Sequence, residues 1–257
     1  MGGIGNQLFQ LNRAISLKLH GKNVEILHYG LFKKIINFII GHSSHNDWID
    51  IGSLCHSIDI RCKSISLFDF SKLILLFINK KIFSKSDFDT SLKNRLNSLN
   101  YYDIGYFQRK EQFLNEAQEI LINKLLEILE LNGKINKKRN INFHLRGGDF
   151  FYKENNIDIL KKPNFTEIKK IIKNIKSKDV LINIVSDDKK ILKNNIFNEF
   201  EINFISSSPK KDFLFLSRSD QMYVSQSSYS YWAFLLANKT RSCILLNKDS
   251  WIYSDLL

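Results

Sequence analysis

The second half of the chain alternates short apolar segments with amphipathic ones, and this alternation constrains the fold more than any other feature. Apolar runs typical of buried strands occur at 141–145, 180–185, 202–206, 222–224 and 243–246. Segments with helical periodicity lie at 165–175, 189–193, 210–217 and 229–236. The pattern predicts βαβ units that form a parallel sheet. Ligands of such sheets bind beyond the carboxyl ends of the strands, so the residues after each strand are candidates for a site.

The first half is less regular, but it also predicts an α/β domain. The chain opens on a glycine-rich turn and enters a helix that has Leu8, Leu11, Ile15 and Leu19 on one face. A strand at 24–27, a strand and loop at 103–108 and a long amphipathic helix at about 111–131 follow, while 31–99 cannot be divided. Residues 134–140 are polar and basic and predict a linker. We therefore expect an N-terminal domain at 1–135 and a C-terminal domain at 136–257.

The charge of the chain favours partners that carry negative charge. The 38 Lys and Arg exceed the 26 Asp and Glu, which gives a net charge of +12. Nucleic acid, anionic lipid headgroups and phosphorylated substrates all fit this sign. The excess of positive charge is spread in short Lys runs that are typical of solvated faces. Aromatic residues do not alternate with these runs, and the sequence contains no recognised nucleic-acid-binding motif. We expect no nucleic-acid partner.

Cysteine, histidine and hydropathy patterns narrow the class further. The three cysteines are an odd number without a Cys-x-x-Cys pair, which indicates a reducing cytoplasm. His42 and His45 lie among glycine and serine, so we expect no metal site. The apolar window 67–83 is broken by charged residues, so no transmembrane helix is expected, although peripheral contact with a bilayer stays open.

The run His144-Leu145-Arg146-Gly147-Gly148-Asp149 follows the first strand of the second half. A guanidinium group binds phosphate oxygens bidentately and keeps its charge at any working pH. Two glycines let the backbone approach a diphosphate closely. The alternative is a turn in which Arg146 pairs with Asp149, and the hexapeptide alone does not decide between the two.

Two further strand ends carry polar residues. Ser186-Asp187-Asp188 follows the strand at 180–185 and offers carboxylates to a guanine or a ribose, or caps a helix that starts near Lys189. Ser227 and Ser228 open the helical segment 229–236, where hydroxyls and helix amides suit a phosphate or simply cap a buried helix. Three strand ends of this kind in one sheet together predict a nucleotide-diphosphate pocket.

Five motifs, in order, resemble those of glycosyltransferase family 11, the α-1,2-fucosyltransferases. They are Gly2 to Gln10, Gly105 to Gln108, His144 to Asp149, Ser186 to Asp188 and Ser227 to Ala233. The resemblance implies a GT-B-like fold of two Rossmann-like domains, with the donor site at the carboxyl ends of the C-terminal parallel sheet. It further implies GDP-fucose as donor, a galactose-containing glycan or glycolipid as acceptor, inversion at the anomeric carbon, and neither metal nor cofactor.

The resemblance also assigns roles to residues of this chain. It places Arg146 on the β-phosphate, His144 and Asp187 or Asp188 near the guanine, and Ser227 and Ser228 near the phosphates. Gly3, Gly5 and Asn6 are expected beside the sugar diphosphate. The predicted catalytic residues are Arg146, Asp149 and Asn6, with Asp149 as the nearest candidate for a general base. Bacterial members often build surface polysaccharide, which predicts a cytoplasmic enzyme at the inner face of the membrane.

The sequence departs from the family pattern at three points, and two alternatives to an active fucosyltransferase stay open. Gly147 stands where the family usually has a second Arg, an aromatic pair downstream is not evident, and the chain starts at the glycine turn without the usual preceding strand. A degenerate, inactive GDP-binding module is therefore one alternative. A basic nucleic-acid-binding protein, suggested by the net charge, is the other.

Overall fold

The computed structural model describes residues 3–28, 49–66, 90–93, 101–104, 114–131, 138–146, 164–175, 179–188, 197–225 and 227–247. The chain divides into two compact units, Met1–Leu121 and Ile122–Leu257, which are described separately. The expected domain limits, 1–135 and 136–257, stay a prediction.

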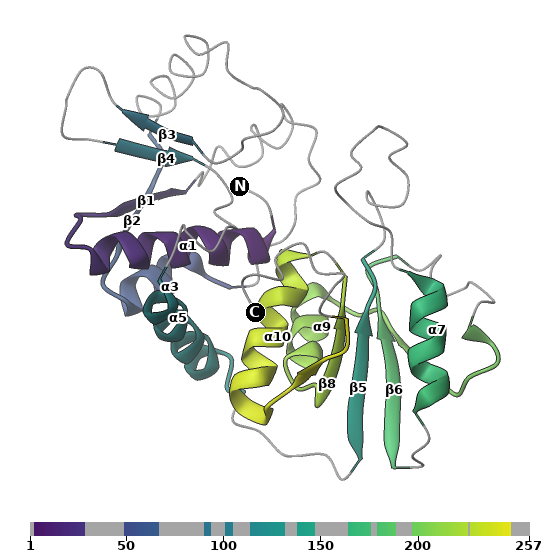
Figure 1. The fold of residues 1–257 in the computed structure, drawn as a ribbon. Coiled ribbons are helices and arrows are strands. Elements are labelled where there is room, and N and C mark those ends of the chain that lie inside the picture. Colours follow the sequence, from purple (N-terminus) through teal and green to yellow (C-terminus); the bar gives the residue numbers. More distant parts are fainter. Residues whose placement is uncertain are drawn as a thin grey trace, which may run out of the picture. The chain divides into compact units, whose positions relative to one another are not determined.

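The first unit combines helices with two small strand pairs (Figure 1). Its described elements are α1 (Ile4–Leu19), β1 (Glu25–His28), α3 (Ile51–Ser57), β2 (Arg61–Ser64), β3 (Thr90–Lys93), β4 (Tyr101–Ile104) and α5 (Asn115–Ile128), the last of which continues into the second unit. β1 pairs with β2 in parallel, and β3 pairs with β4 antiparallel. The apolar face of α1 is buried, as its periodicity predicts, with Leu8 and Leu11 fully inaccessible.

The second unit is built on one five-stranded parallel sheet. Its described elements are β5 (Arg139–His144), α7 (Phe165–Asn174), β6 (Val180–Val185), β7 (Asn203–Ile205), α9 (Pro209–Leu216), β8 (Gln221–Val224), α10 (Ser228–Arg241) and β9 (Ile244–Leu245). The strand order is β7-β6-β5-β8-β9, so the chain runs outward from β5 to one edge and then returns to build the other. This is a doubly wound order whose switch point lies between β5 and β8. The expected α/β class and parallel sheet are confirmed.

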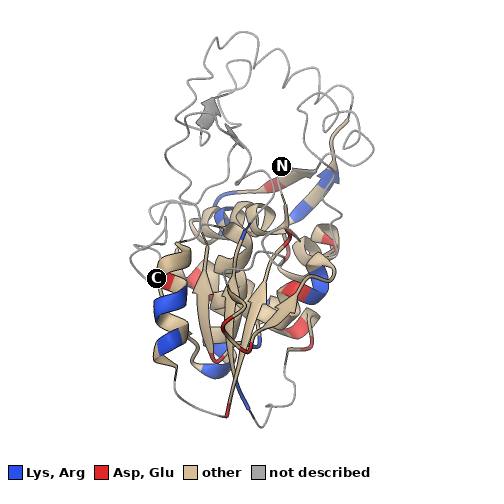
Figure 2. Cartoon of the chain, turned by 90° about the vertical axis from the view of Figure 1, so that its right-hand side faces the viewer, with Lys and Arg blue, Asp and Glu red and all other residues tan. Residues whose placement is uncertain are grey.

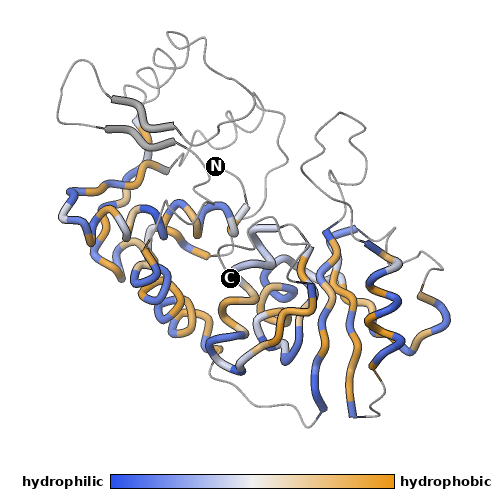
Figure 3. The backbone as a smooth tube through the Cα atoms, in the orientation of Figure 1, coloured by the Kyte–Doolittle hydropathy of each residue, from blue (hydrophilic) through white to orange (hydrophobic). Residues whose placement is uncertain are grey.

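Alternation along β5 separates the two faces of this sheet. Ile141 and Phe143 point into an apolar core with Ile184 and Tyr223 of the neighbouring strands. Helix α7 covers this face through Ile168 and Ile172, which belong to the same core, and its polar residues lie on the outer side. Figure 3 shows the resulting alternation of apolar and polar residues around α7.

The opposite face carries a row of hydrogen-bonded amides across three strands. Asn203 Nδ2 donates to Asn183 Oδ1 at 3.1 Å, and Asn183 Nδ2 donates to Asn142 Oδ1 at 2.7 Å. Asn142 Nδ2 then donates to Ser219 Oγ at 2.7 Å. The three asparagines are paired residues in the strand register, so the row fits this register and would be broken by a slip of one residue.

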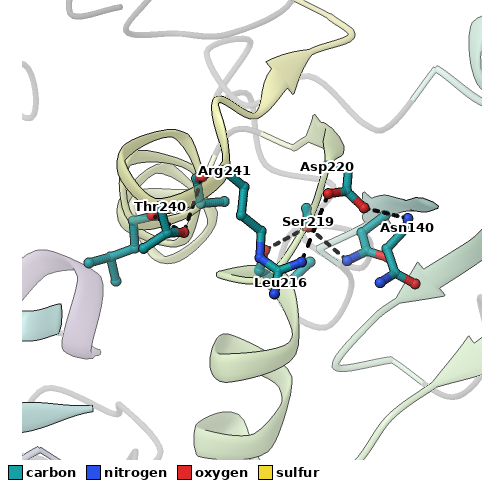
Figure 4. Close-up of polar contacts among 9 residues, drawn as sticks. Asn140, Leu216, Ser219, Asp220, Thr240 and Arg241 are labelled. Atoms are coloured by element: carbon teal, nitrogen blue, oxygen red, sulfur yellow. Dashed lines mark hydrogen bonds and ion pairs between the residues drawn. The ribbon is translucent and has the colours of Figure 1, made fainter. Parts of the chain in front are cut away.

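The start of β8 is fixed to β5 by a second polar cluster (Figure 4). Asp220 Oδ2 accepts from the backbone N–H of Asn140 at 2.7 Å, and Asp220 Oδ1 lies 3.9 Å from Arg241 Nη1. Ser219 Oγ donates to the Leu216 carbonyl at 2.6 Å. Arg139 and Asn140 therefore belong to β5, and placing them in a linker was wrong. Their polarity hid the strand because Asn140 is buried against Asp220, which is distant in sequence.

The amide row predicts that the same substitution, Asn to Ala, lowers the free energy of unfolding by different amounts at two of its positions. Asn183→Ala removes the two hydrogen bonds of Asn183 within the row and its longer bond to the Leu181 carbonyl, and leaves the buried amide oxygen of Asn142 unsatisfied. We therefore expect a loss of about 2–3 kcal/mol in the free energy of unfolding. Asn203→Ala at the exposed end of the row should cost only about 0.5–1 kcal/mol. Urea unfolding of both variants measures the difference, and equal losses would contradict a register-fixing role for the row.

Candidate functional site

Three strand ends of the second unit meet at one edge of the sheet. His144, the last residue of β5, pairs with Val185 of β6 on one side and with Val224 of β8 on the other. The next residues along the chain, Ser186 after β6 and Ser225 after β8, therefore lie beside the start of the Arg146 loop. The sequence predicted this meeting of strand ends, and it falls at the switch point of the sheet.

Ser225 connects the two strands that flank the switch point. Its Oγ lies 3.0 Å from Nδ1 of His144 and accepts from the backbone N–H of Arg146 at 3.2 Å. Its own N–H donates to the His144 carbonyl at 3.1 Å. The loop that carries Arg146 thus leaves β5 in a direction set by β8.

The guanidinium of Arg146 lies at the N-terminus of α10. Arg146 Nη1 donates to Oγ of Ser227, the N-cap residue, at 3.5 Å. Ser230 Oγ donates to the carbonyls of Ser225 and Ser227, which holds the turn before the helix. A helix N-terminus carries partial positive charge and N–H groups that the helix itself cannot bond. Two positive groups side by side favour an anion between them, as a diphosphate would be.

His144 is buried and uncharged at neutral pH. Its side chain belongs to a residue only 5% exposed, and its ring lies 5.6 Å from the ring of Tyr229. The pKa of His144 is lowered from 6.5 to about 4, chiefly by burial; the charge of Asp187 opposes this shift, and that of Arg146 contributes to it. The ring therefore takes part as a neutral hydrogen-bonding group.

The Ser186-Asp187-Asp188 segment turns directly after β6. Ser186 Oγ accepts from the N–H of Asp188 at 3.1 Å, and Asp187 is exposed. The helix that Ser186 or Asp187 was alternatively expected to cap, near Lys189, lies outside the described residues. Asp187 is close enough to His144 for its charge to raise the pKa of that ring, so it belongs to the same site.

Two further residues of the site were given no role from the sequence. The ring of Tyr229 lies between His144 and Phe213, with a centroid distance of 5.2 Å to Phe213, and its hydroxyl donates to the Pro209 carbonyl. Burial, with the charges of Asp212 and Asp187, raises the pKa of Tyr229. No local pattern singles out Asp212, because its place near the site depends on how α9 packs.

The site therefore has two electrostatic sides. Burial and the nearby charge of Asp187 raise the pKa of Asp212, opposed by the Ser207 N–H that donates to its carboxylate at 3.1 Å. Asp187 and Asp212 form the acidic side, whereas Arg146 and the start of α10 form the basic side. A nucleoside diphosphate matches both, because a base can donate hydrogen bonds and the diphosphate is anionic.

The remaining predicted site residues belong to the first unit, to the start of α10 or to the part of the chain outside the described residues. Gly3 is the N-cap of α1, and Gly5 and Asn6 are in its first turn, all in the first unit. The φ of Gly3 is −69°, which other residues also adopt. Ser228 is the buried first residue of α10. Gly147, Gly148 and Asp149 lie outside the described residues, so the pairing of Arg146 with Asp149 and the role of Asp149 stay predictions.

Among the residues that the structure describes, no helix is long and apolar enough to cross a membrane. The same part of the chain contains no group of three or more His, Cys, Asp or Glu side chains arranged to hold a metal ion. Cys55, Cys62 and Cys243 are all free thiols.

A doubly wound parallel sheet with an arginine and a helix N-terminus at its switch point defines a nucleotide-binding α/β domain. The family model of glycosyl transferase family 11 matches residues 70–254, and the chain belongs to this family. It is accordingly a glycosyltransferase, an enzyme class that takes a sugar from an activated donor to a glycan acceptor. The resemblance to this family that the sequence motifs indicated is confirmed.

Other comparisons add little to this assignment. No curated protein sequence matches the chain. A solved structure, the β-Kdo 2,7-transferase KpsC of Thermosulfurimonas dismutans, is 14% identical, with 84% of this chain and 76% of that chain covered and a TM-score of 0.31.

The buried His144 predicts a pH dependence of stability. Between its native pKa of about 4 and its ordinary value of 6.5, the unfolded chain binds a proton that the native state does not. The free energy of unfolding should therefore fall as the pH falls, by about 1–2 kcal/mol between pH 7 and pH 5. Urea unfolding across this range measures the slope.

Two variants separate this effect from the rest of the titration. His144→Gln should flatten the acid slope, whereas the same substitution at the exposed His56 should leave it nearly unchanged. An unaltered slope in His144→Gln would contradict the neutral, buried state of the ring.

Proposed function

We propose that the protein transfers L-fucose from GDP-fucose to a hydroxyl of a galactoside, with inversion at the anomeric carbon. The observation that carries the proposal is the contact between the Arg146 guanidinium and the N-cap of α10, at the switch point of the sheet. A transferase of this family needs a site for a diphosphate leaving group, and these two groups provide one.

Charge on the leaving group dominates the chemistry. The acceptor oxygen forms a bond to the anomeric carbon while the bond from that carbon to the β-phosphate oxygen breaks. The acceptor proton passes to a base, for which Asp149 is the proposed candidate, and the electron pair of the broken bond stays on GDP. Arg146, the α10 amides and the Ser227 hydroxyl would stabilise this charge without a metal, and single preorganised donors contribute about 3–4 kcal/mol in other enzymes.

Recognition of guanine would fall to the acidic side of the site. Guanine presents an N1–H and an amino group side by side, and one carboxylate accepts from both. Asp187 is exposed at the strand end and is electrostatically linked to His144, which supports its assignment to the base. Asp188, whose N–H is held by Ser186, is the second candidate.

The first unit would supply the acceptor side of a GT-B-like enzyme. Gly3, Gly5 and Asn6, at the start of α1, are the residues proposed to reach the sugar diphosphate, and Asp149 is the proposed general base. We assign the reaction to bacterial surface polysaccharide synthesis, in the cytoplasm and with peripheral contact at the inner membrane face. Galactose-containing glycans or glycolipids are the proposed acceptors.

The charge distribution favours a small anionic ligand over nucleic acid. Figure 2 shows that the described Lys and Arg residues are spread over several elements with Asp and Glu among them. Ion pairs such as Lys169 with Glu199 at 3.2 Å also use part of the excess. Nucleic-acid binding generally needs a continuous basic surface, so the net charge alone supports that alternative weakly.

The proposal predicts that Arg146 is needed for turnover and not for folding. Arg146→Ala should lower fucose transfer from GDP-fucose by about 100- to 1000-fold, and Arg146→Lys should restore only part of the rate because it lacks the bidentate fork. The exposed Arg218→Ala is the matched control and should keep full activity. Hydrolysis and transfer assays with GDP-fucose, GDP-mannose and UDP-galactose on galactoside acceptors provide the measurement.

Distinct outcomes separate the alternatives. Turnover of GDP-fucose by an Arg146→Ala enzyme at the native rate would sink the assignment of the diphosphate site. Tight GDP binding without turnover of any sugar nucleotide would instead favour the inactive module.

A further inference from the structure

We propose that Ser225 is a positioning residue that holds His144 in the tautomer with its proton on Nε2, and so makes the ring a hydrogen-bond donor towards the nucleotide base. The first part concerns the protein alone. The second part rests on the proposed function, because it needs a nucleotide in the site.

The assignment of the His144 tautomer follows from the donors and acceptors around the Ser225 hydroxyl. A serine hydroxyl has one proton to donate and two lone pairs that accept. The N–H of Arg146 can only donate, so at 3.2 Å it uses a lone pair of Ser225 Oγ. The hydroxyl proton then needs an acceptor. In the part of the chain that the structure describes, the acceptor within reach is Nδ1 of His144 at 3.0 Å.

The other tautomer of His144, with its proton on Nδ1, leaves the hydroxyl proton of Ser225 without an acceptor among the described residues. If Nδ1 of His144 carried the proton, Ser225 Oγ would accept from both His144 and Arg146, and its own proton would have no acceptor among the described residues. Ser225 is only 7% exposed, so such a proton would also be largely removed from water. Leaving a buried donor unsatisfied is unfavourable, which favours the Nε2–H tautomer.

The surrounding contacts keep Ser225 in the position that this requires. Its N–H is bonded to the His144 carbonyl at 3.1 Å, and its carbonyl accepts from Ser230 Oγ at 3.2 Å. The His144 ring is limited in turn by the ring of Tyr229. The backbone of Ser225 is thus held by His144 of β5 and by Ser230 of α10, and this keeps the Ser225 hydroxyl beside His144 Nδ1.

The fixed tautomer has a consequence for base selection. A neutral ring that donates through Nε2–H favours a base edge that accepts, such as the oxo group of guanine, and disfavours the amino group of adenine, which donates. Together with a carboxylate that accepts from guanine, the site would present both kinds of partner. Sites that hydrogen-bond a ligand reject analogues that leave the buried group unpaired.

The tautomer can be measured directly in the protein without ligand. The two ring nitrogens of a neutral histidine have distinct ¹⁵N chemical shifts according to which one is protonated, and His144→Gln identifies the His144 signals. At neutral pH we expect an unprotonated Nδ1 and a protonated Nε2. A protonated Nδ1 in the wild-type protein would overturn the proposal, whatever the enzyme's substrate.

Variants of Ser225 separate positioning from packing. Ser225→Ala should convert the His144 signals to the other tautomer or to a mixture, while Ser225→Thr should keep the wild-type pattern because it keeps the hydroxyl. Ser217→Ala is the matched control, since it also removes a buried hydroxyl, one that bonds the Phe213 carbonyl at 2.9 Å. It should leave the His144 signals unchanged.

Binding of GDP and ADP, measured by calorimetry, tests the second part. Ser225→Ala should reduce the preference for GDP over ADP by about five- to tenfold, and Ser225→Thr should retain it. An unchanged preference in a Ser225→Ala variant whose tautomer has shifted would overturn the role in base selection. If the wild-type protein binds neither nucleotide, the proposed function fails, while the tautomer measurement still tests the first part.

Discussion

The row of amides from the exposed Asn203 through the buried Asn183 to the buried Asn142 connects three strands of the second unit, and the position of the functional site depends on the register that this row fits. In a parallel sheet a slip of one residue would move every side chain of β5 to the other face. It would bury Asn142 in the apolar core and carry His144 away from Ser225. The same register places the ends of β5, β6 and β8 at one edge, so the chemistry of the site is a consequence of strand pairing.

Strand pairing also brings groups of opposite charge together at one edge of the sheet. The winding of the sheet reverses between β5 and β8. Arg146 and the N-terminus of α10 lie at this switch point, whereas the charge of Asp187 acts on the buried ring of His144, and the charges of Asp212 and Asp187 act on the ring of Tyr229. A ligand with a hydrogen-bonding base and an anionic diphosphate fits such a division of charge.

The sequence predicted the apolar strands and the amphipathic helices of the second unit well, because each has a period that a local pattern reveals. It also identified His144, Arg146 and Ser227, since strand ends in a parallel sheet converge. The beginning of β5 was missed because Asn140 is satisfied by Asp220, and Asp212 was missed because its place depends on the packing of α9. Pairings between residues distant in sequence have no local signature, and the role of Ser225 depends only on such pairings.

A crystal structure of the protein with bound GDP tests the central claim most directly, namely that these strand ends form one nucleotide-diphosphate site. The account predicts phosphate oxygens within hydrogen-bond distance of the Arg146 guanidinium and of the first amides of α10, with the base beside His144 and Asp187. A GDP molecule bound elsewhere, with no phosphate oxygen in contact with Arg146, would contradict it.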